Sequence, residues 1–299
     1  MTELHYPATV ELAPATRSRL AAYVALTKPR IIELLLITTV PAMVLAARGW
    51  PGTWLVVATL IGGTLSAGGA NTLNMFYDRD IDEVMRRTSS RPLARHEVLP
   101  RNAMIFGIAL GIAGFAWLWV FTNLLAALIS TAALVFYVLV YTRMLKRVTV
   151  QNIVIGGAAG AAPALVGWAA VTGTVSVPAW VLFLIVFYWT PPHFWALAVR
   201  YRDDYAAAGV PMLPVVAGIE TTTRRMLLYT ALMVGVSLLL VPLATMSWVY
   251  LAAAVILGGW FLWDTWRVVA DPGQAMRLFT TSTVYLSALF ASVMLDVLL

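Results

Sequence analysis

The stretch AMIFGIALGIAGFAWLWVFTNLLAALISTAALVFYVLVYT, residues 103–142, carries no charged side chain. It is long enough to cross a hydrocarbon core of about 30 Å twice as helices, with a turn near Thr122 and Asn123. Similar apolar runs recur along almost the whole chain of 299 residues. We therefore expect an all-α integral membrane protein, with no room for a separate soluble domain.

The overall composition agrees with this interpretation. Charged residues make up 11% of the chain, whereas a soluble domain carries roughly 25%. The net charge of +6 does not indicate nucleic-acid binding, because the basic residues lie in short connections between apolar runs, where they set membrane topology. Cysteine is absent, which excludes a thiolate nucleophile. The first residues resemble neither a signal peptide nor a transit peptide, so we expect a bacterial inner-membrane location.

Hydropathy and charge together define the expected topology. The apolar runs predict nine membrane-spanning helices, at about 30–48, 53–76, 103–121, 124–142, 151–171, 178–199, 225–244, 247–264 and 279–298. With these spans, all of the 20 basic residues except Arg48 fall on one side. This asymmetry predicts a cytoplasmic N-terminus and an exoplasmic C-terminus. We divide the chain into a cytoplasmic tail, residues 1–24, and a membrane domain, residues 25–299, with active-site loops near 77–102 and 200–224.

A polar stripe marks the end of the second predicted span, in GGANTLNMFYDRDID, residues 68–82. Asn71, Asn74, Asp78 and Asp82 are spaced 3, 4 and 4 residues apart, so they share one face of a helix. Polar side chains that enter a bilayer are costly unless they are paired, so this stripe is a candidate functional site. Carboxylates beside amide oxygens are typical ligands of Mg²⁺, which also binds substrate phosphates.

Arginines follow this stripe at once, in RRTSSRPL, residues 86–93. Arg86, Arg87 and Arg91 could bind phosphate oxygens in bidentate fashion, so the segment indicates a diphosphate site. The simpler interpretation is a solvated loop helix stabilised by pairs such as Asp82–Arg86. That interpretation leaves the buried asparagines of the stripe unexplained.

A second polar group ends the sixth predicted span, in YWTPPHFWALAVRYRDDYAAAGVPMLP, residues 188–214. His193, Arg200 and Asp204 have the same offsets, 7 and 11, as Asn71, Asp78 and Asp82. In a continuous helix they share a face, and Asp203 is rotated away. His193 follows two prolines among aromatic residues, and three roles stay open for it: a buried core residue, an axial iron ligand or a proton acceptor.

The fourth predicted loop adds further cationic groups, in YTRMLKRVTVQN, residues 141–152. Tyr141, Lys146 and Arg147 lie on the same predicted cytoplasmic side. They either set the topology or bind a diphosphate or carboxylate group.

These motifs resemble those of the UbiA superfamily of intramembrane prenyltransferases. Its first Asp-rich motif, NxxxDxxxD, matches Asn74, Asp78 and Asp82. Within the superfamily, the segments TLNMFYDRDIDEVMRRT, YTRMLKR, PPHFWALA and DDYAAAGVPMLPVV resemble the haem-farnesylating family, and the resemblance runs from about residue 25 to near the end. The second motif departs from the usual spaced pair of acids, because Asp203 and Asp204 are adjacent. Their placement on the helix favours Asp204 as the pocket residue.

The resemblance implies a UbiA-type bundle and a reaction. Farnesyl diphosphate and haem B are the implied substrates, haem O and diphosphate the products, Mg²⁺ the metal and a haem A synthase a candidate partner. The implied catalytic residues are Asn74, Asp78, Asp82, His193 and Asp204, of which all but His193 are candidate metal ligands. The implied substrate-binding residues are Asn71, Arg86, Arg87, Arg91, Tyr141, Lys146, Arg147, Arg200 and Asp203.

Three other functions fit these features less well. A 4-hydroxybenzoate polyprenyltransferase shares NxxxDxxxD and RPL, but it should lack PPHFW and it does not use haem. A transporter predicts acidic residues near the middle of the bilayer rather than at its edge. A purely structural subunit does not require two matched polar faces.

Overall fold

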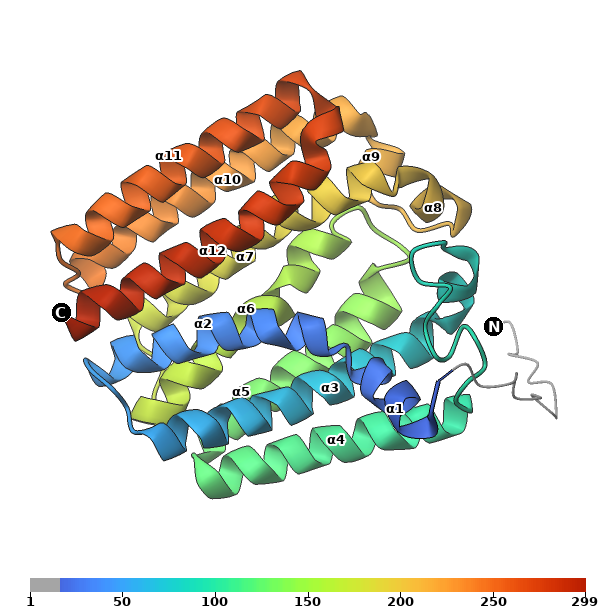
Figure 1. Cartoon of the computed structure of the whole chain (residues 1–299), viewed down its shortest axis with the longest axis horizontal. Helices are drawn as coiled ribbons and strands as arrows, with labels where there is room; N and C mark the ends of the chain where they lie inside the picture. Colours follow the sequence, from blue (N-terminus) through green and yellow to red (C-terminus); the bar gives the residue numbers. More distant parts are fainter. Residues whose placement is uncertain (1–16) are drawn as a thin grey trace.

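The computed structural model describes residues 17–299, and all regular structure in this range is helical (Figure 1). The first sixteen residues of the predicted tail lie outside the described residues. The helices are α1 (Arg19–Thr27), α2 (Pro29–Ala47), α3 (Thr53–Val84), α4 (Pro100–Phe121), α5 (Leu124–Val135), the π-helix η1 (Phe136–Leu145), α6 (Asn152–Thr172), α7 (Val177–Arg200), α8 (Arg202–Ala207), α9 (Leu213–Val216), α10 (Gly218–Leu243), α11 (Trp248–Ala270), the 3₁₀ turn η2 (Pro272–Gln274) and α12 (Ala275–Leu298).

Eight helical segments among the described residues are long and apolar enough to cross a membrane. They are α3, α4, α5 with η1, α6, α7, α10, α11 and α12 with η2. The first predicted span, at about 30–48, corresponds to α2, in which the apolar segment Ile37–Ala47 is too short to count by itself. The all-helical membrane fold is thus confirmed, whereas the count of nine spans and the orientation of the termini stay predictions.

The helix α3 is longer than the sequence pattern predicted. It has 32 residues and so measures about 48 Å, which exceeds a hydrocarbon core of about 30 Å. The surplus lies at its C-terminal end and contains Asp78 and Asp82. The first part of the expected loop at 77–102, residues 77–84, is therefore helix, and these carboxylates are fixed on a rigid element.

The long helices pack as a bundle, with α8, α9 and the loop after α3 gathered at the end opposite the C-terminus (Figure 1). Close approach between α3 and α4 depends on glycine, because a Cβ on Gly69 would lie 2.7 Å from the carbonyl oxygen of Gly107. The largest apolar core joins residues of α6, α7, α10, α11 and α12, including the fully buried Trp195, Tyr250 and Tyr285.

The helix α1 packs on the helical bundle, although its first part, residues 19–24, was assigned to the tail. Its Ala22 and Leu26 are buried against Met75 of α3 and Ala103 of α4. Packing thus begins before residue 25, where the membrane domain was expected to start. The contact brings the end of α1 beside the polar stripe of α3.

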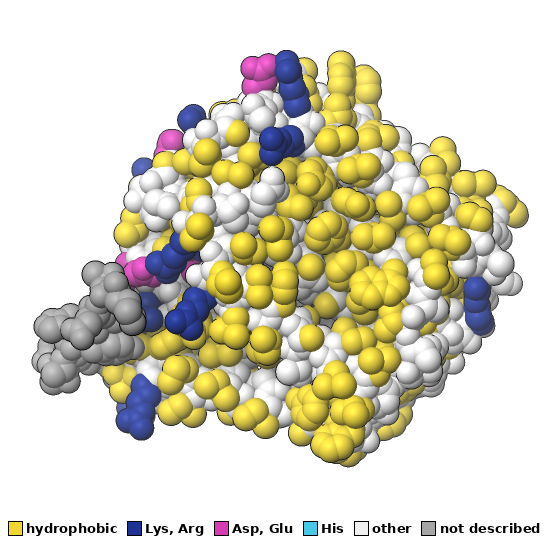
Figure 2. Space-filling view, turned by 180° about the vertical axis from the view of Figure 1, so that it is seen from behind, with side chains coloured by type: hydrophobic (Ala, Val, Ile, Leu, Met, Phe, Trp, Pro, Cys, Tyr) yellow, Lys and Arg dark blue, Asp and Glu magenta, His cyan; other side chains and the backbone are white. Residues whose placement is uncertain are grey.

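The outer surface is apolar over the middle of the molecule, and charged side chains gather toward one end (Figure 2). Large side chains such as Ile112, Trp119 and Val120 are more than half exposed in the absence of lipid. A soluble protein rarely presents so continuous an apolar surface, whereas a bilayer accommodates it. The exposed surface therefore agrees with a multi-pass membrane protein.

Candidate functional site

Asn74, Asp78 and Asp82 are all buried on one face of α3, at 3%, 0% and 1% exposure. Their spacing of four residues aligns them along the helix, as predicted. Asn71 is also buried, but its amide donates to the carbonyl oxygen of Thr27, 2.9 Å away. Asn71 therefore holds the end of α1, and the polar centre consists of the other three residues.

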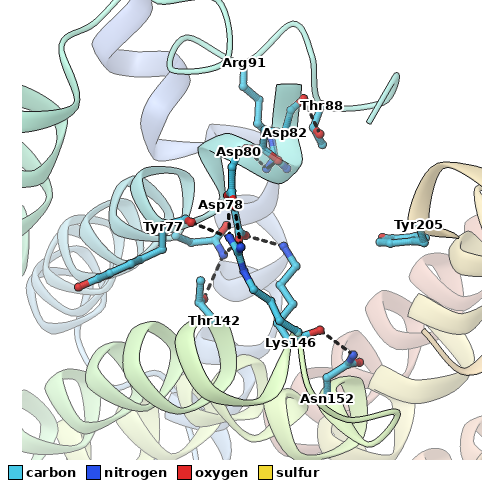
Figure 3. Close-up of polar contacts among 12 residues, drawn as sticks. Tyr77, Asp78, Asp80, Asp82, Thr88, Arg91, Thr142, Lys146, Asn152 and Tyr205 are labelled. Carbon is cyan, nitrogen blue, oxygen red and sulfur yellow. Dashed lines mark hydrogen bonds and ion pairs between the residues drawn. The ribbon is translucent and has the colours of Figure 1, made fainter. Parts of the chain in front are cut away.

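Asp78 is the best-held carboxylate of this centre (Figure 3). Its Oδ2 accepts hydrogen bonds from Nζ of Lys146 at 2.5 Å and from Nδ2 of Asn74 at 2.8 Å. Its Oδ1 is buried and accepts no hydrogen bond from any described residue, and NH2 of Arg147 lies 4.0 Å from it. One carboxylate oxygen thus orients the group while the other stays available to a ligand.

The π-helix η1 brings two residues to this centre, Thr142 beside Asn74 and Lys146 beside Asp78. Wide i→i+5 turns of this kind are rare and occur frequently at functional sites. Thr142 accepts a hydrogen bond from Nδ2 of Asn74 at 3.0 Å and donates to the carbonyl of Tyr137, five residues back, at 2.8 Å. The end of η1 then directs Lys146 at Asp78. The sequence motifs did not identify Thr142 as a site residue, because only the packing of η1 on α3 brings it to Asn74.

Lys28 is a second residue that the site analysis of the sequence missed. It lies in the break between α1 and α2, where Pro29 disfavours continued helix, and adopts φ +53°. Its Nζ donates to Oδ1 of Asn74 at 2.7 Å. Burial, and next the positive charge of Arg91, lower the pKa of Lys28 well below its usual value. The left-handed backbone and the burial of the amine both cost free energy. At this cost, the side chain of Lys28 lies against the polar stripe of α3.

Arg91 neutralises the other carboxylate of the stripe. Its NH1 lies 2.8 Å from both oxygens of Asp82. The segment after α3 folds back through successive turns, and Thr88 donates to the carbonyl oxygen of Asp82 at 3.4 Å. The expected proximity of Arg91 to the acidic motif is therefore present, and it comes from the loop rather than from a continued helix.

Arg147 points to the outer side of the cluster. Its guanidinium pairs with both oxygens of Asp80, each at 2.7 Å, and also donates to the carbonyl of Tyr77 at 2.9 Å. The carboxylate of Asp80 is 61% exposed. Arg147 thus borders the polar centre, and Asp80 is turned toward water.

Asp204 does not share a helix with His193, so the predicted continuous face is wrong. The helix α7 ends at Arg200, and Tyr201 separates it from the short helix α8. Asp204 instead accepts from the backbone N–H of Arg87 at 3.3 Å and lies 3.7 Å from Nε of Arg86. It therefore joins α8 to the loop after α3.

Two aromatic side chains, Tyr201 just before α8 and Tyr205 within it, also contact the loop after α3. Arg87 donates to the hydroxyl of Tyr205 at 3.2 Å, and its guanidinium lies 5.9 Å from the ring centres of Tyr201 and Tyr205. Tyr205 lies across from the carboxylate cluster, on a different element (Figure 3). Arg200 and Asp203 are exposed, and the structure brings neither into the cluster around Asp78.

His193 is buried between α7 and α12 rather than against α3. Its ring stacks on Trp189 and Phe279, with centroid distances of 4.2 and 4.3 Å, and its Nδ1 lies 2.7 Å from Oγ of Ser282. The residue is 4% exposed. The prolines before it are accommodated within a continuous α7.

Tyr141 lies on η1, its ring stacked on that of Tyr137 with centroids 5.3 Å apart. The ring also covers Gly156 of α6, and a Cβ at this glycine would collide with it. Tyr141 therefore depends on a glycine on the neighbouring helix, on the side of η1 that also bears Lys146.

The donor set fits a magnesium ion that is shared with a substrate. In the described part of the chain, no three acidic or histidine side chains are grouped as an all-protein metal site. Mg²⁺ however is usually held by one or two carboxylates, with waters and substrate phosphates as its other ligands. Asp78 and Asp82 meet this need, and the unpartnered Oδ1 of Asp78 marks the place. Asp204 contacts Arg86 and Arg87 of the loop after α3 (the arginine loop), and its role as a metal ligand stays a prediction.

Comparison with known proteins identifies the family. Residues 35–291 match the UbiA prenyltransferase family. The chain is 55% identical to a protoheme IX farnesyltransferase of Parafrankia sp., over 94% of this chain and 91% of that protein. The fold is similar to digeranylgeranylglyceryl phosphate synthase, with a TM-score of 0.77 and 18% identity over 93% and 98% of the two chains. It is also similar to a UbiA homolog from Archaeoglobus fulgidus bound to DMAPP and Mg²⁺, with a TM-score of 0.61 and 17% identity over 91% and 99%.

A helical membrane bundle, a buried NxxxDxxxD stripe and similarity along nearly the whole length lead to one assignment. The chain belongs to the UbiA prenyltransferase family, and within it to the protoheme IX farnesyltransferases.

Proposed function

We propose that this protein transfers the farnesyl group of farnesyl diphosphate to a vinyl group of haem B, with addition of water, and releases haem O and diphosphate. The observation that carries this proposal is the buried pair Asp78 and Asp82, which contact Lys146 and Arg91, with Lys28 bound to the neighbouring Asn74. A diphosphate and a divalent cation together satisfy such a mixture of charges. The relatives named protoheme IX farnesyltransferase support haem B as the acceptor.

The residues of the cluster divide into two roles. Asp78, Asp82 and the amide oxygen of Asn74 would hold Mg²⁺, with the diphosphate completing its coordination. When bound, the metal neutralises charge that develops on the leaving diphosphate. Lys146, Arg91 and Lys28 would turn from the stripe to the phosphate oxygens, and Arg86, Arg87 and Arg147 border the same region.

The chemical step needs charge stabilisation rather than a protein nucleophile. As the bond between C1 and the diphosphate oxygen breaks, cationic side chains placed in advance stabilise the departing anion. The allylic cation that remains is attacked by the vinyl π-electrons, and water adds to the resulting cation and releases a proton. The stacked rings of Tyr137 and Tyr141 present π faces that favour a nearby cation. The surrounding apolar helices exclude other water.

The asymmetry of the charged residues supports an orientation. The polar cluster, the arginine loop and α8 would face the cytoplasm of a bacterial cell, with the C-terminus exoplasmic. Haem O is a hydrophobic product in the membrane, so direct transfer to a haem A synthase is a natural next step.

A product assay tests this function. Detergent-solubilised protein is incubated with haem B, farnesyl diphosphate and Mg²⁺, and the extracted haems are separated by liquid chromatography and weighed by mass spectrometry. We expect a more hydrophobic haem, heavier by one farnesyl group and one water, whose formation stops with EDTA and resumes when Mg²⁺ is restored. A folded protein that binds both substrates but forms no such haem would disprove the proposal, and 4-hydroxybenzoate would be the next acceptor to try.

A further inference from the structure

His193 forms a hydrogen-bond chain with α12 that defines where the imidazole proton lies. Oγ of Ser282 lies 2.7 Å from the carbonyl oxygen of Phe279 and 2.7 Å from Nδ1 of His193. Two oxygens at 2.7 Å need a proton between them, and a carbonyl has none to give. The single hydroxyl proton of Ser282 therefore points at Phe279.

The imidazole must then donate to the serine. With its only proton committed, Ser282 offers a lone pair to Nδ1, so His193 carries its proton on Nδ1. Nε2 consequently has a free lone pair. It has no hydrogen-bond partner among the described residues and is not one of the fully enclosed polar atoms. A nitrogen with a fixed lone pair and no protein partner is suited to a metal ion.

The surroundings fix the direction of this lone pair. Trp189 and Phe279 cover the two faces of the ring with interplanar angles of 20° and 24°, and the Phe194 ring stands edge-on at 5.2 Å. The aromatic rings block rotation, and the serine prevents the opposite tautomer. His193 is also two helical turns, about 10 Å, deeper along α7 than Arg200, which is suited to a flat amphipathic ligand at the membrane edge.

We propose that Ser282 is a positioning residue that holds His193 in its Nδ1-protonated tautomer, so that Nε2 binds the iron of haem B during the reaction. The inference rests on haem being the acceptor in the proposed function. Ser282 acts through His193 and touches neither iron nor the reacting carbons. Hydrogen bonds to the remote nitrogen of a metal-bound imidazole both orient it and strengthen its donor atom.

The test measures haem binding without farnesyl diphosphate. Ferric haem B is titrated into purified protein in detergent, and the Soret and visible bands report the axial ligand. We expect His193→Gly to abolish the imidazole signature, and added free imidazole to restore it. Ser282→Ala should weaken haem affinity by about tenfold, within the usual range for loss of such a partner, and Ser282→Thr should recover most of it.

The chain offers a matched control for the lost serine. Ser292 lies on the same helix, is also buried, and donates to the carbonyl three residues back, Leu289, at 2.7 Å, but it contacts no histidine among the described residues. Ser292→Ala should leave the haem spectrum and affinity unchanged. Metal-free protoporphyrin IX is a second control, because its affinity should be the same in all folded variants if iron is the group that His193 recognises.

Several outcomes would overturn the proposal. An unchanged iron spectrum in His193→Gly would show that His193 does not bind the iron. Unchanged haem affinity in Ser282→Ala would show that Ser282 does not position His193. If the variants lose affinity equally for haem and for metal-free protoporphyrin, the mutated residues act through packing rather than through binding of the iron. If the wild type still forms farnesylated haem in these cases, the proposed function stands. Iron ligation by His193 without any farnesylated product would instead refute the proposed function.

Discussion

Replacement of Asp78 by asparagine tests the central carboxylate with the least change of shape. The carboxamide oxygen can still accept from Lys146, which now pairs with Oδ2 at 2.5 Å. The negative charge and the free Oδ1 are lost, so one of two metal-binding carboxylates disappears. Loss of one group that stabilises transition-state charge reduces turnover by about 100- to 1,000-fold, or about 3–4 kcal/mol. We expect the upper end, because Asp78 is fully buried.

The assay is the formation of farnesylated haem under saturating Mg²⁺, with kcat and KM measured separately for both substrates. Glu83→Gln is the control, because it removes a carboxylate from the same helix at a site that is 47% exposed. It should change activity by less than about threefold, as expected for an exposed group. Size-exclusion chromatography and thermal unfolding would show that each variant is folded. If Asp78→Asn is folded and keeps more than about a tenth of the wild-type kcat/KM, the assignment of Asp78 fails.

Four further predictions follow from the same cluster. Lys28→Met should raise the KM for farnesyl diphosphate by about tenfold at neutral pH, the effect of one lost charge-assisted hydrogen bond. Because the pKa of Lys28 is lowered, wild-type affinity should fall as the pH rises through it, and pH-dependent KM measurements should show no such fall in this variant. Arg91→Ala leaves a buried carboxylate unpaired and should destabilise the protein by about 2–4 kcal/mol, visible as a lower thermal midpoint. Gly156→Val should displace Tyr141 and reduce turnover, whereas Gly160→Ala, with nothing within 4 Å, should not. Calorimetry should show that Mg²⁺ binds more tightly when inorganic diphosphate is present than when it is absent.

The part of the site that lies on one helix was predictable from sequence. Asn74, Asp78 and Asp82 are four residues apart, and helical geometry alone places them on one face. Lys28 and Thr142 were not identified as members of the site, because their partners lie 46 and 68 residues away in sequence. Only the packing of α1 and η1 against α3 brings them together. A lysine before a proline at a helix break was the one local signal for Lys28.

The second polar group shows the opposite case, in which a correct local pattern led to a wrong arrangement. The offsets of His193 and Asp204 fit one helical face only if α7 continues beyond Arg200. Tyr201 ends it with φ −107° and ψ 28°, a conformation that any residue can adopt, so neither glycine nor proline marks the break. As a result, His193 contacts α12 whereas Asp204 contacts the arginine loop.

The charges of the cluster explain why metal and substrate should bind together. Lys146 and Arg91 contact the two carboxylates of α3, and Lys28 contacts Asn74 on the same stripe. Three cations and two carboxylates leave a formal excess of one positive charge. A magnesium ion alone would add two more positive charges to a buried site, and a diphosphate alone would add about three negative charges while the carboxylates remain. Both together bring the formal total to zero, which avoids the large penalty for uncompensated charge away from water. The ion pairs within the protein thus have equivalents in the loaded site: the metal takes over the carboxylates, and the freed lysines and arginine take over the diphosphate.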